Sequence, residues 1–167
     1  MCTARVVEPE DFVALVEREY LPLCRVATLI VRDPGLGEEV VQEAFTRALL
    51  RWGRISRYDR PGAWLRLVTV RLAVRSAEKR RPIRSAAHIP DQSQIDTHPD
   101  PDLAAAIAEL SPVERAVIVL HYLCDLPVEE VATAMRSKPA TTRVRLHRAR
   151  AKLADALTQE GDDVTAR

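Results

Sequence analysis

The stretch LPVEEVATAMRSKPATTRVRLHRARAKL, Leu126 to Leu153, places two short helical patterns on either side of a polar turn. From Lys138 onward it carries six basic side chains and a histidine without a single acidic residue, although the net charge of the 167-residue chain is only +1. Two helices joined by a turn of about three residues, the second of them basic near its start, are typical of a helix-turn-helix. The stretch therefore predicts an all-α unit that binds nucleic acid.

The second helix of this motif separates apolar from basic side chains. On a helical projection one stripe is apolar and should face a core: Leu146, Ala149, Leu153 and Leu157. The polar side is almost entirely basic, so like charges repel by about 0.2–0.5 kcal/mol a pair. It is either a solvated face or the face that meets a polyanion. Together with the helix-turn-helix it favours DNA, with these expected contacts: Lys138, Thr141, Arg143, Arg145 and Arg148.

Helix-start signals place this motif within a larger helical unit. Ser111-Pro112-Val113-Glu114 is a capping box with proline at the first helical position, followed by an apolar run through Leu123. The first part of the chain also has helical periodicity, from about Glu10 to Arg81. Its first helix should break or kink at Pro22, and a second should start at Asp33-Pro34.

A third helix of the first part should run from Pro61 to Arg81, after a loop that reads WGRISRYDRPG. The next segment, Pro82 to Asp102, is rich in Pro, Asp, Ser and Gln and reads as a mobile linker. We therefore expect an all-α chain of two small helical domains, with domains at 1–81 and 102–160, the linker at 82–101 and a tail at 161–167.

Two further surfaces are predicted in the first domain. The azimuth that carries Trp64, Val68 and Leu72 continues to Arg75 and Lys79, which indicates either an anion-binding surface or a basic helix end favoured by the macrodipole. Arg71, Arg80, Arg81 and Arg84 add to this patch. The preceding helix is acidic and polar at Glu39, Gln42 and Glu43, which by itself is typical of a solvated face.

Several classes of function are disfavoured. No E-x-x-H metal pair, Gly-rich phosphate loop or activated nucleophile is present, so we expect no enzyme and no cofactor. Cys2, Cys24 and Cys124 are too far apart for a zinc site, and we expect Cys24 and Cys124 to be small buried hydrophobes in a reducing cytoplasm. We also expect no signal peptide, no membrane insertion and no large sensory domain after the second helical unit.

The motifs resemble one protein family over nearly the whole chain. GEEVVQEAFTRALLRW and PGAWLRLVTVRLAVRSAEKRR resemble region 2 of bacterial RNA polymerase sigma factors of the extracytoplasmic-function (ECF) group of the sigma-70 family. LSPVERAVIVLHYLCDLPVEEVATAM and TTRVRLHRARAKL are similar to region 4 of that family. The resemblance implies a sigma factor that directs core polymerase to promoters and initiates transcription there.

The resemblance also implies partners and site residues. Glu39, Gln42 and Glu43 would contact the polymerase clamp, and region 4 would contact the flap as well as the −35 element. The −10 element would meet the loop from Arg51 to Arg60 and the next helix, with these contacts: Arg71, Arg75, Lys79 and Arg80. The −35 contacts are those already listed, from Lys138 to Arg148. An anti-sigma factor is a further expected partner, and the protein would be cytoplasmic, with the nucleoid when bound to polymerase.

Some positions depart from the family pattern. Glu39 replaces the usual aspartate, and Arg71 replaces the usual asparagine of the −10 helix. Arg136, Lys138 and Ala140 replace a glycine, the N-cap serine and a further glycine in the helix-turn-helix, unless Ser137 takes over the cap. A left-handed Arg136 would cost about 1 kcal/mol. The alternatives are therefore a DNA-binding regulator and a polymerase-binding decoy that starts no transcription.

Overall fold

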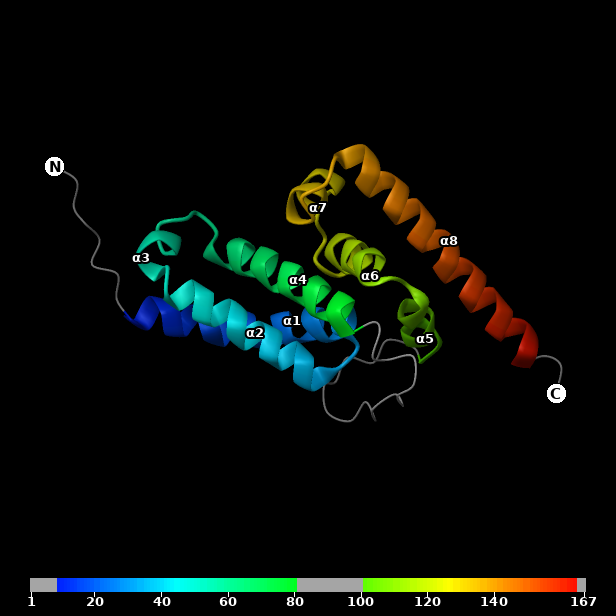
Figure 1. Ribbon diagram of the computed structural model, residues 1–167, viewed down its shortest axis with the longest axis horizontal. Helices are drawn as coiled ribbons and strands as arrows, with labels where there is room; N and C mark the ends of the chain where they lie inside the picture. The colour runs from blue at the N-terminus through cyan, green and yellow to red at the C-terminus, as the bar shows by residue number, and fades with distance from the viewer. Residues whose placement is uncertain (1–8, 81–100, 165–167) are drawn as a thin grey trace.

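The protein is all-helical over residues 9–80 and 101–164, which the computed structural model describes (Figure 1). The fold-class prediction is thus confirmed for these residues. The predicted linker falls almost wholly on residues 81–100 and, like Cys2, Arg81 and Arg84, lies outside the described residues. In chain order the helices are α1 (Pro9–Val31), α2 (Pro34–Leu49), α3 (Trp52–Ile55), α4 (Pro61–Arg80), α5 (Pro101–Glu109), α6 (Pro112–Ile118), the π-helical η2 (Val119–Leu123), α7 (Val128–Ala134) and α8 (Pro139–Val164).

Helices α1, α2 and α4 pack side by side and form the core of the first half (Figure 1). The prediction of a break or kink at Pro22 is wrong as to the break, because α1 continues through the proline as one helix. Proline in a helix interior costs about 3 kcal/mol. Here Leu15 before the proline and Leu23 and Ile30 after it are buried in the same core, and this packing stabilises the helix on both sides of the proline.

The start of α2 forms as the sequence predicts. The Asp33 carboxylate accepts a hydrogen bond from the backbone N–H of Leu36 at 3.0 Å, and Pro34 occupies the first turn. The loop expected from Trp52 to Gly62 is partly helical, because its first four residues form α3 and bury Ile55. These two turns set the positions of α2 and α4 relative to each other.

Gly37 of α2 lies close to the backbone of α1. A Cβ atom at this position would lie 3.0 Å from the backbone nitrogen of Thr28 and 3.1 Å from its Cα. We expect Gly37→Ala to lower the free energy of unfolding by about 1–3 kcal/mol, because the backbone of α1 must move. Urea unfolding measures the loss. Gly53→Ala is the matched control, since a Cβ there meets no atom within 4 Å, and an equal loss in both variants would contradict the prediction.

The second half is built on the helix-turn-helix and its supporting helices. The capping box is confirmed, since Ser111 and Glu114 exchange both of its hydrogen bonds at the start of α6. The helix then widens into η2, whose end is closed by the Cys124 N–H donating to Val119 O at 3.1 Å. Leu146 and Ala149 of α8 are buried as predicted, whereas Leu157 is 39% exposed because α8 has run past its supporting helices there.

The two halves pack against each other, which the sequence did not indicate. Helix α6 lies against α1 and α4, and one contiguous apolar core contains residues of both halves. Arg115 is the polar centre of this contact. It is only 6% exposed, and its guanidinium donates to Ile30 O at 2.8 Å and to Leu110 O at 2.6 Å. A helix of the second half thereby satisfies a C-terminal carbonyl of α1.

Candidate nucleic-acid interface

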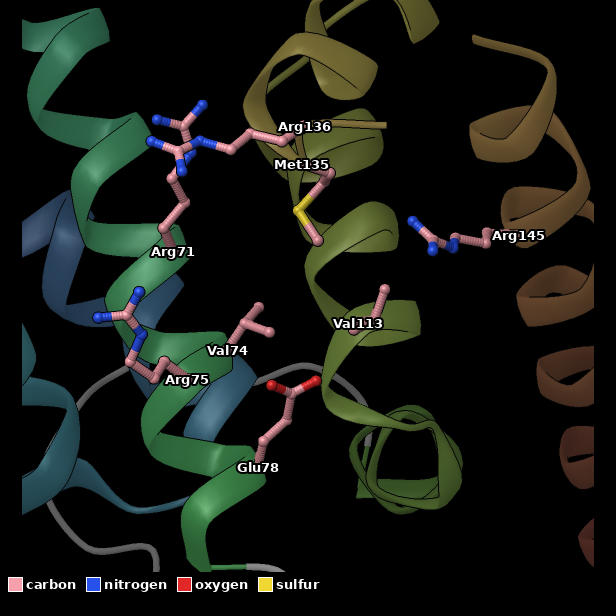
Figure 2. Close-up of a pocket in the computed structure, with 8 residues that line it drawn as sticks. All are labelled: Arg71, Val74, Arg75, Glu78, Val113, Met135, Arg136 and Arg145. Atoms are coloured by element: carbon pink, nitrogen blue, oxygen red, sulfur yellow. The ribbon is translucent and has the colours of Figure 1, made fainter. Parts of the chain in front are cut away.

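The outer face of α8 carries most of the residues predicted for duplex DNA. Lys138, Thr141, Arg143 and Arg148 are exposed, while Thr142 beside them is fully buried. The fifth predicted residue, Arg145, is half-buried and lines a cleft between the two halves (Figure 2). Arg145 lies beside the buried side of α8. Its side chain therefore points toward α6 and not away from the protein.

The same face carries two residues that the sequence analysis missed. Val144 is 48% exposed, and His147 is exposed beside it. An exposed valine within a basic helix was the available signal, since apolar side chains contact the thymine methyl group in the major groove. The Arg143 guanidinium is bound to Glu129 at 2.7 Å, but both side chains are about 60% exposed. Exposed ion pairs stabilise little, so Arg143 can exchange Glu129 for a phosphate or a base.

The turn of the helix-turn-helix forms despite its unusual sequence. Arg136 has a φ of 49°, the left-handed conformation that the sequence analysis identified as costly. The Ser137 N–H donates to Ala132 O at 2.9 Å, and the Ser137 hydroxyl shares a hydrogen bond of 2.7 Å with the buried Thr142 hydroxyl. These bonds tie the turn to both helices and hold Arg136 in its strained conformation.

A basic cleft of about 270 Å³ lies between α2, α4 and the turn after α7. Its described lining contains no carboxylate and consists of apolar side chains and five arginines: Trp64, Val68, Leu72, Arg47, Arg51, Arg71, Arg75 and Arg136. An aromatic and aliphatic floor surrounded by guanidinium groups suits the bases and phosphates of a single strand. We call it the strand cleft.

Of the four residues predicted to contact the −10 strand, two line the strand cleft and two lie outside its lining. Arg71 and Arg75 line the strand cleft, together with Arg47 and Arg51 of the neighbouring segment. Lys79 is exposed one turn beyond Arg75, outside the lining. Arg80 binds the carboxylate of Asp33 at 3.3 Å, and so also supports the start of α2.

Arg71 differs from the other arginines because its guanidinium is already bound. Its Nε donates to Ala134 O at 2.8 Å and its Nη2 to Thr133 O at 3.0 Å, both carbonyls at the end of α7. Burial and the nearby charge of Arg136 lower the pKa of Arg71 (Figure 2). The group nevertheless remains a cation. The residue predicted to contact DNA thus contacts the second half of the chain in this structure.

The acidic surface of α2 borders the strand cleft but contributes none of its lining side chains. Glu39, Gln42 and Glu43 are exposed, while Val40, Val41 and Ala44 of the same helix face the core. Glu43 pairs with Arg47 one turn later at 2.7 Å, in an exposed geometry that stabilises little. The predicted polymerase-binding residues therefore form one accessible patch, which we call the acidic patch.

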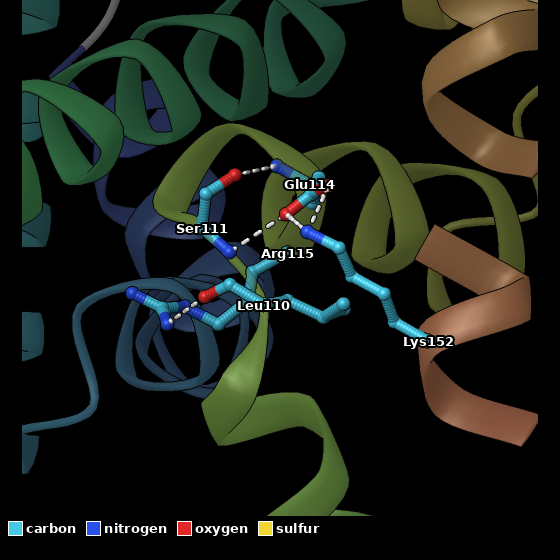
Figure 3. A network of polar contacts seen from close by, with 5 residues as sticks. All are labelled: Leu110, Ser111, Glu114, Arg115 and Lys152. Atoms are coloured by element: carbon cyan, nitrogen blue, oxygen red, sulfur yellow. Dashed lines mark hydrogen bonds and ion pairs between the residues drawn. The ribbon is translucent and has the colours of Figure 1, made fainter. Parts of the chain in front are cut away.

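A polar network joins α6 to α8 behind the DNA-facing surface (Figure 3). Lys152 Nζ lies 2.7 Å and 3.0 Å from the two carboxylate oxygens of Glu114, which also accepts from the Ser111 N–H at 2.9 Å. Burial alone would raise the pKa of Glu114, but the hydrogen bonds from Lys152 and Ser111 outweigh it and lower the pKa. The carboxylate thus both caps α6 and fixes α8.

We expect Glu114→Gln to make the free energy of unfolding less dependent on pH. A carboxyl group with a lowered folded-state pKa stabilises the fold above its unfolded pKa of about 4.3, and this contribution is lost as the pH falls through the folded value. The variant should therefore unfold about 1 kcal/mol more easily near pH 7, and the deficit should shrink toward about pH 3. Urea unfolding at both pH values measures it, with the exposed Glu130→Gln as control. A deficit independent of pH would contradict the prediction.

Other kinds of site find little support. Within 9–80 and 101–164, three metal-binding side chains do not come together anywhere, and none of the described helices is long and apolar enough to cross a bilayer. Cys24 is 4% exposed, as predicted, whereas Cys124 is only half-buried because it ends η2 at the surface. Burial raises the pKa of both thiols, which disfavours the reactive thiolate.

Comparisons with family models match both halves. Residues 15–83 match the model described as Sigma-70 region 2, and residues 102–153 match the model described as Sigma-70, region 4. The first match contains α2, α3 and α4. The second contains α7 and the first part of α8, which form the helix-turn-helix. The acidic patch and most of the strand-cleft lining thus lie in the segment matched by the first model, and the outer face of α8 lies in the segment matched by the second.

Curated relatives cover the chain to different extents. A "Probable ECF RNA polymerase sigma factor SigI" of Mycobacterium tuberculosis is 37% identical over 78% of this chain, which spans half of that relative's length. An "RNA polymerase sigma-E factor" of Streptomyces avermitilis is 31% identical over the whole chain and 93% of the relative. The structure of the sigma factor RpoE in complex with the anti-sigma factor NepR from Bartonella quintana has a TM-score of 0.68 over 89% of this chain and 98% of that one. Because its identity is 21%, it shows the fold alone.

Proposed function

The chain belongs to the ECF group of the sigma-70 family of RNA polymerase sigma factors, and from this premise we propose that it directs core polymerase to promoters and starts transcription there. The observation that carries the proposal is the separation of three surfaces. Two are basic, the outer face of α8 and the strand cleft, and the third, the acidic patch, is formed by other side chains of α2.

The surfaces take the following roles in the proposal. The acidic patch binds a basic surface of the polymerase clamp, because complementary charge steers and orients such contacts. The strand cleft holds the opened −10 strand by stacking on Trp64 and by arginine–phosphate contacts. The outer face of α8 reads the −35 element in the major groove, while the second half also contacts the polymerase flap.

The domain boundaries follow the same proposal. Region 2 occupies 1–81 and region 4 occupies 102–160, with the connection at 82–101. Polymerase acts in the bacterial cytoplasm, so the protein is proposed to act there too. An anti-sigma factor is a further proposed partner, supported by the fold shared with the sigma factor of the NepR complex.

The experiment that tests the function is reconstitution of the full chain with bacterial core polymerase on a pool of genomic promoter fragments. Core polymerase alone is the control. New start sites that share two upstream elements are expected. Core binding without new start sites would overturn the proposal and favour a decoy, and duplex binding without core binding would favour a stand-alone regulator. The intact turn at Arg136 argues against a defective helix-turn-helix.

A further inference from the structure

A cavity of about 300 Å³ between α4, α6 and α8 holds more positive charge than its one acid balances (Figure 2). Four arginines and a single carboxylate line it: Arg71, Arg75, Arg136, Arg145 and Glu78. Within the described residues, Arg75, Arg136 and Arg145 make no hydrogen bond or ion pair. Because guanidinium groups are always charged, a cavity with this lining attracts anions. We call it the arginine cavity.

Arg71 is fixed in place and still has donors left. Its Nε donates to Ala134 O at 2.8 Å and its Nη2 donates to Thr133 O at 3.0 Å. A guanidinium group has five N–H donors, so three of them remain for a ligand. The two bonds to backbone carbonyls orient the group, and little side-chain freedom is lost when an anion binds to it.

Arg136 stands in an unfavourable place for two reasons. Its φ is 49°, a left-handed conformation that disfavours any residue with a side chain. Its charge also lies near enough to lower the pKa of Arg71. Arg71 and Arg136 are both positions at which this chain departs from the family pattern, and both departures add a cation to the same cavity. An anion bound between the two groups would replace their repulsion by attraction to a shared partner.

The middle of the arginine cavity is apolar. Val74, Val113 and Met135 lie between the charged groups and are half-buried (Figure 2). Small-molecule sites typically combine such an apolar wall with a few converging polar groups, in a volume of about 300 Å³ or more. Methionine adapts its shape to a flat ring. The Glu78 carboxylate can accept a hydrogen bond from an amino or hydroxyl group, which an inorganic anion does not offer.

Arg145 completes the cavity from the side of α8. It lies across the apolar side chains from Arg71 and Arg136 (Figure 2). Guanidinium groups bind phosphate oxygens in pairs of parallel hydrogen bonds, so cations on both sides suit several linked phosphates. We propose that the arginine cavity binds a nucleoside diphosphate or triphosphate, with its phosphates on the arginines and its base on the apolar wall. The proposal is independent of the proposed function.

Isothermal titration calorimetry of the full chain tests the site without polymerase and without DNA. The probes are ATP, GTP, inorganic triphosphate and adenosine, each at about 0.15 M salt, where non-specific attraction is screened. We expect saturable one-to-one binding of ATP or GTP. Its affinity should exceed the affinities of inorganic triphosphate and adenosine by at least about tenfold, because only a nucleotide uses both the arginines and the apolar wall.

Three variants locate the binding. Arg145→Gln should weaken it by at least about tenfold, since hydrogen bonds between two charged groups are strong ones. Arg51→Gln is the matched control, because this exposed arginine lines the strand cleft alone, and it should change the affinity by less than about twofold. Val113→Glu should abolish binding by adding a negative charge to the cavity. It should still fold, because an acid in the first turn of α6 is favourable there.

Each outcome supports the nucleotide site or overturns it. Absence of saturable binding would overturn it, and so would equal affinities for inorganic triphosphate and for the nucleotides. Equal losses in Arg145→Gln and Arg51→Gln would show general attraction to basic surfaces and would also overturn it. Circular dichroism checks that each variant folds. Failure here leaves the proposed function standing, because polymerase is absent from the test, and failure to start transcription leaves the nucleotide site standing.

Discussion

Replacing Glu39 and Glu43 by lysine in one variant should lower the affinity for core polymerase by at least about 100-fold. Both carboxylates are exposed on α2, and the helix turns Val40 and Ala44 into the core, so the change alters the acidic patch without altering the packing. Placing like charges against a complementary surface costs several kcal/mol. Native-gel or anisotropy titration of the labelled chain with core polymerase measures the loss, which transcription should follow.

A control at another exposed acid separates the patch from net charge. Glu17→Lys on α1 reverses one exposed acid outside α2 and should leave core binding within about twofold, because rim or remote charges act mainly on association rate. The double variant should also keep its thermal unfolding. Equal losses at Glu17 and at the acidic patch would show that the acidic patch is not the docking surface.

The second large effect is expected on α8. Arg143→Ala combined with Arg148→Ala removes two exposed cations from its outer face. Each good contact to a base in the major groove contributes about 1–3 kcal/mol of discrimination. Transcription from promoters that depend on the −35 element should therefore fall about 100-fold, while core affinity stays unchanged. In vitro transcription with matched promoters, with and without the element, measures the difference.

The control for this variant is Arg18→Ala on α1, which removes an exposed cation from the first half. Arg18 is 64% exposed, although Glu19 beside it is only 14% exposed, so the loss of this cation should leave transcription unchanged. The double variant should also lose salt sensitivity, since each phosphate contact that disappears lowers the slope of binding against salt. Equal transcription on both promoters would contradict duplex reading by this face.

Local sequence signals predicted the helices well where one residue type has one strong role. Asp33-Pro34 and the Ser111–Glu114 capping box both start helices where expected, because their bonds involve neighbours in the chain. The break predicted at Pro22 does not occur, because it depends on more than local sequence. The cost of a helical proline is local, whereas the packing that offsets it comes from α2 and α4, distant in sequence.

For the candidate sites, too, some features follow from the sequence and others only from the tertiary structure. The sequence alone determined the all-helical class, the helix-turn-helix, the acidic patch and the basic character of α4 and α8, since charge and periodicity are properties of each segment. Only the tertiary structure decided that Arg145 faces a cleft, that Arg71 binds the end of α7, and that Arg115 satisfies a carbonyl of α1. Each of the last two bonds joins side chain and backbone more than sixty residues apart. Because backbone carbonyls are present at every residue, no residue type marks such a partner in advance.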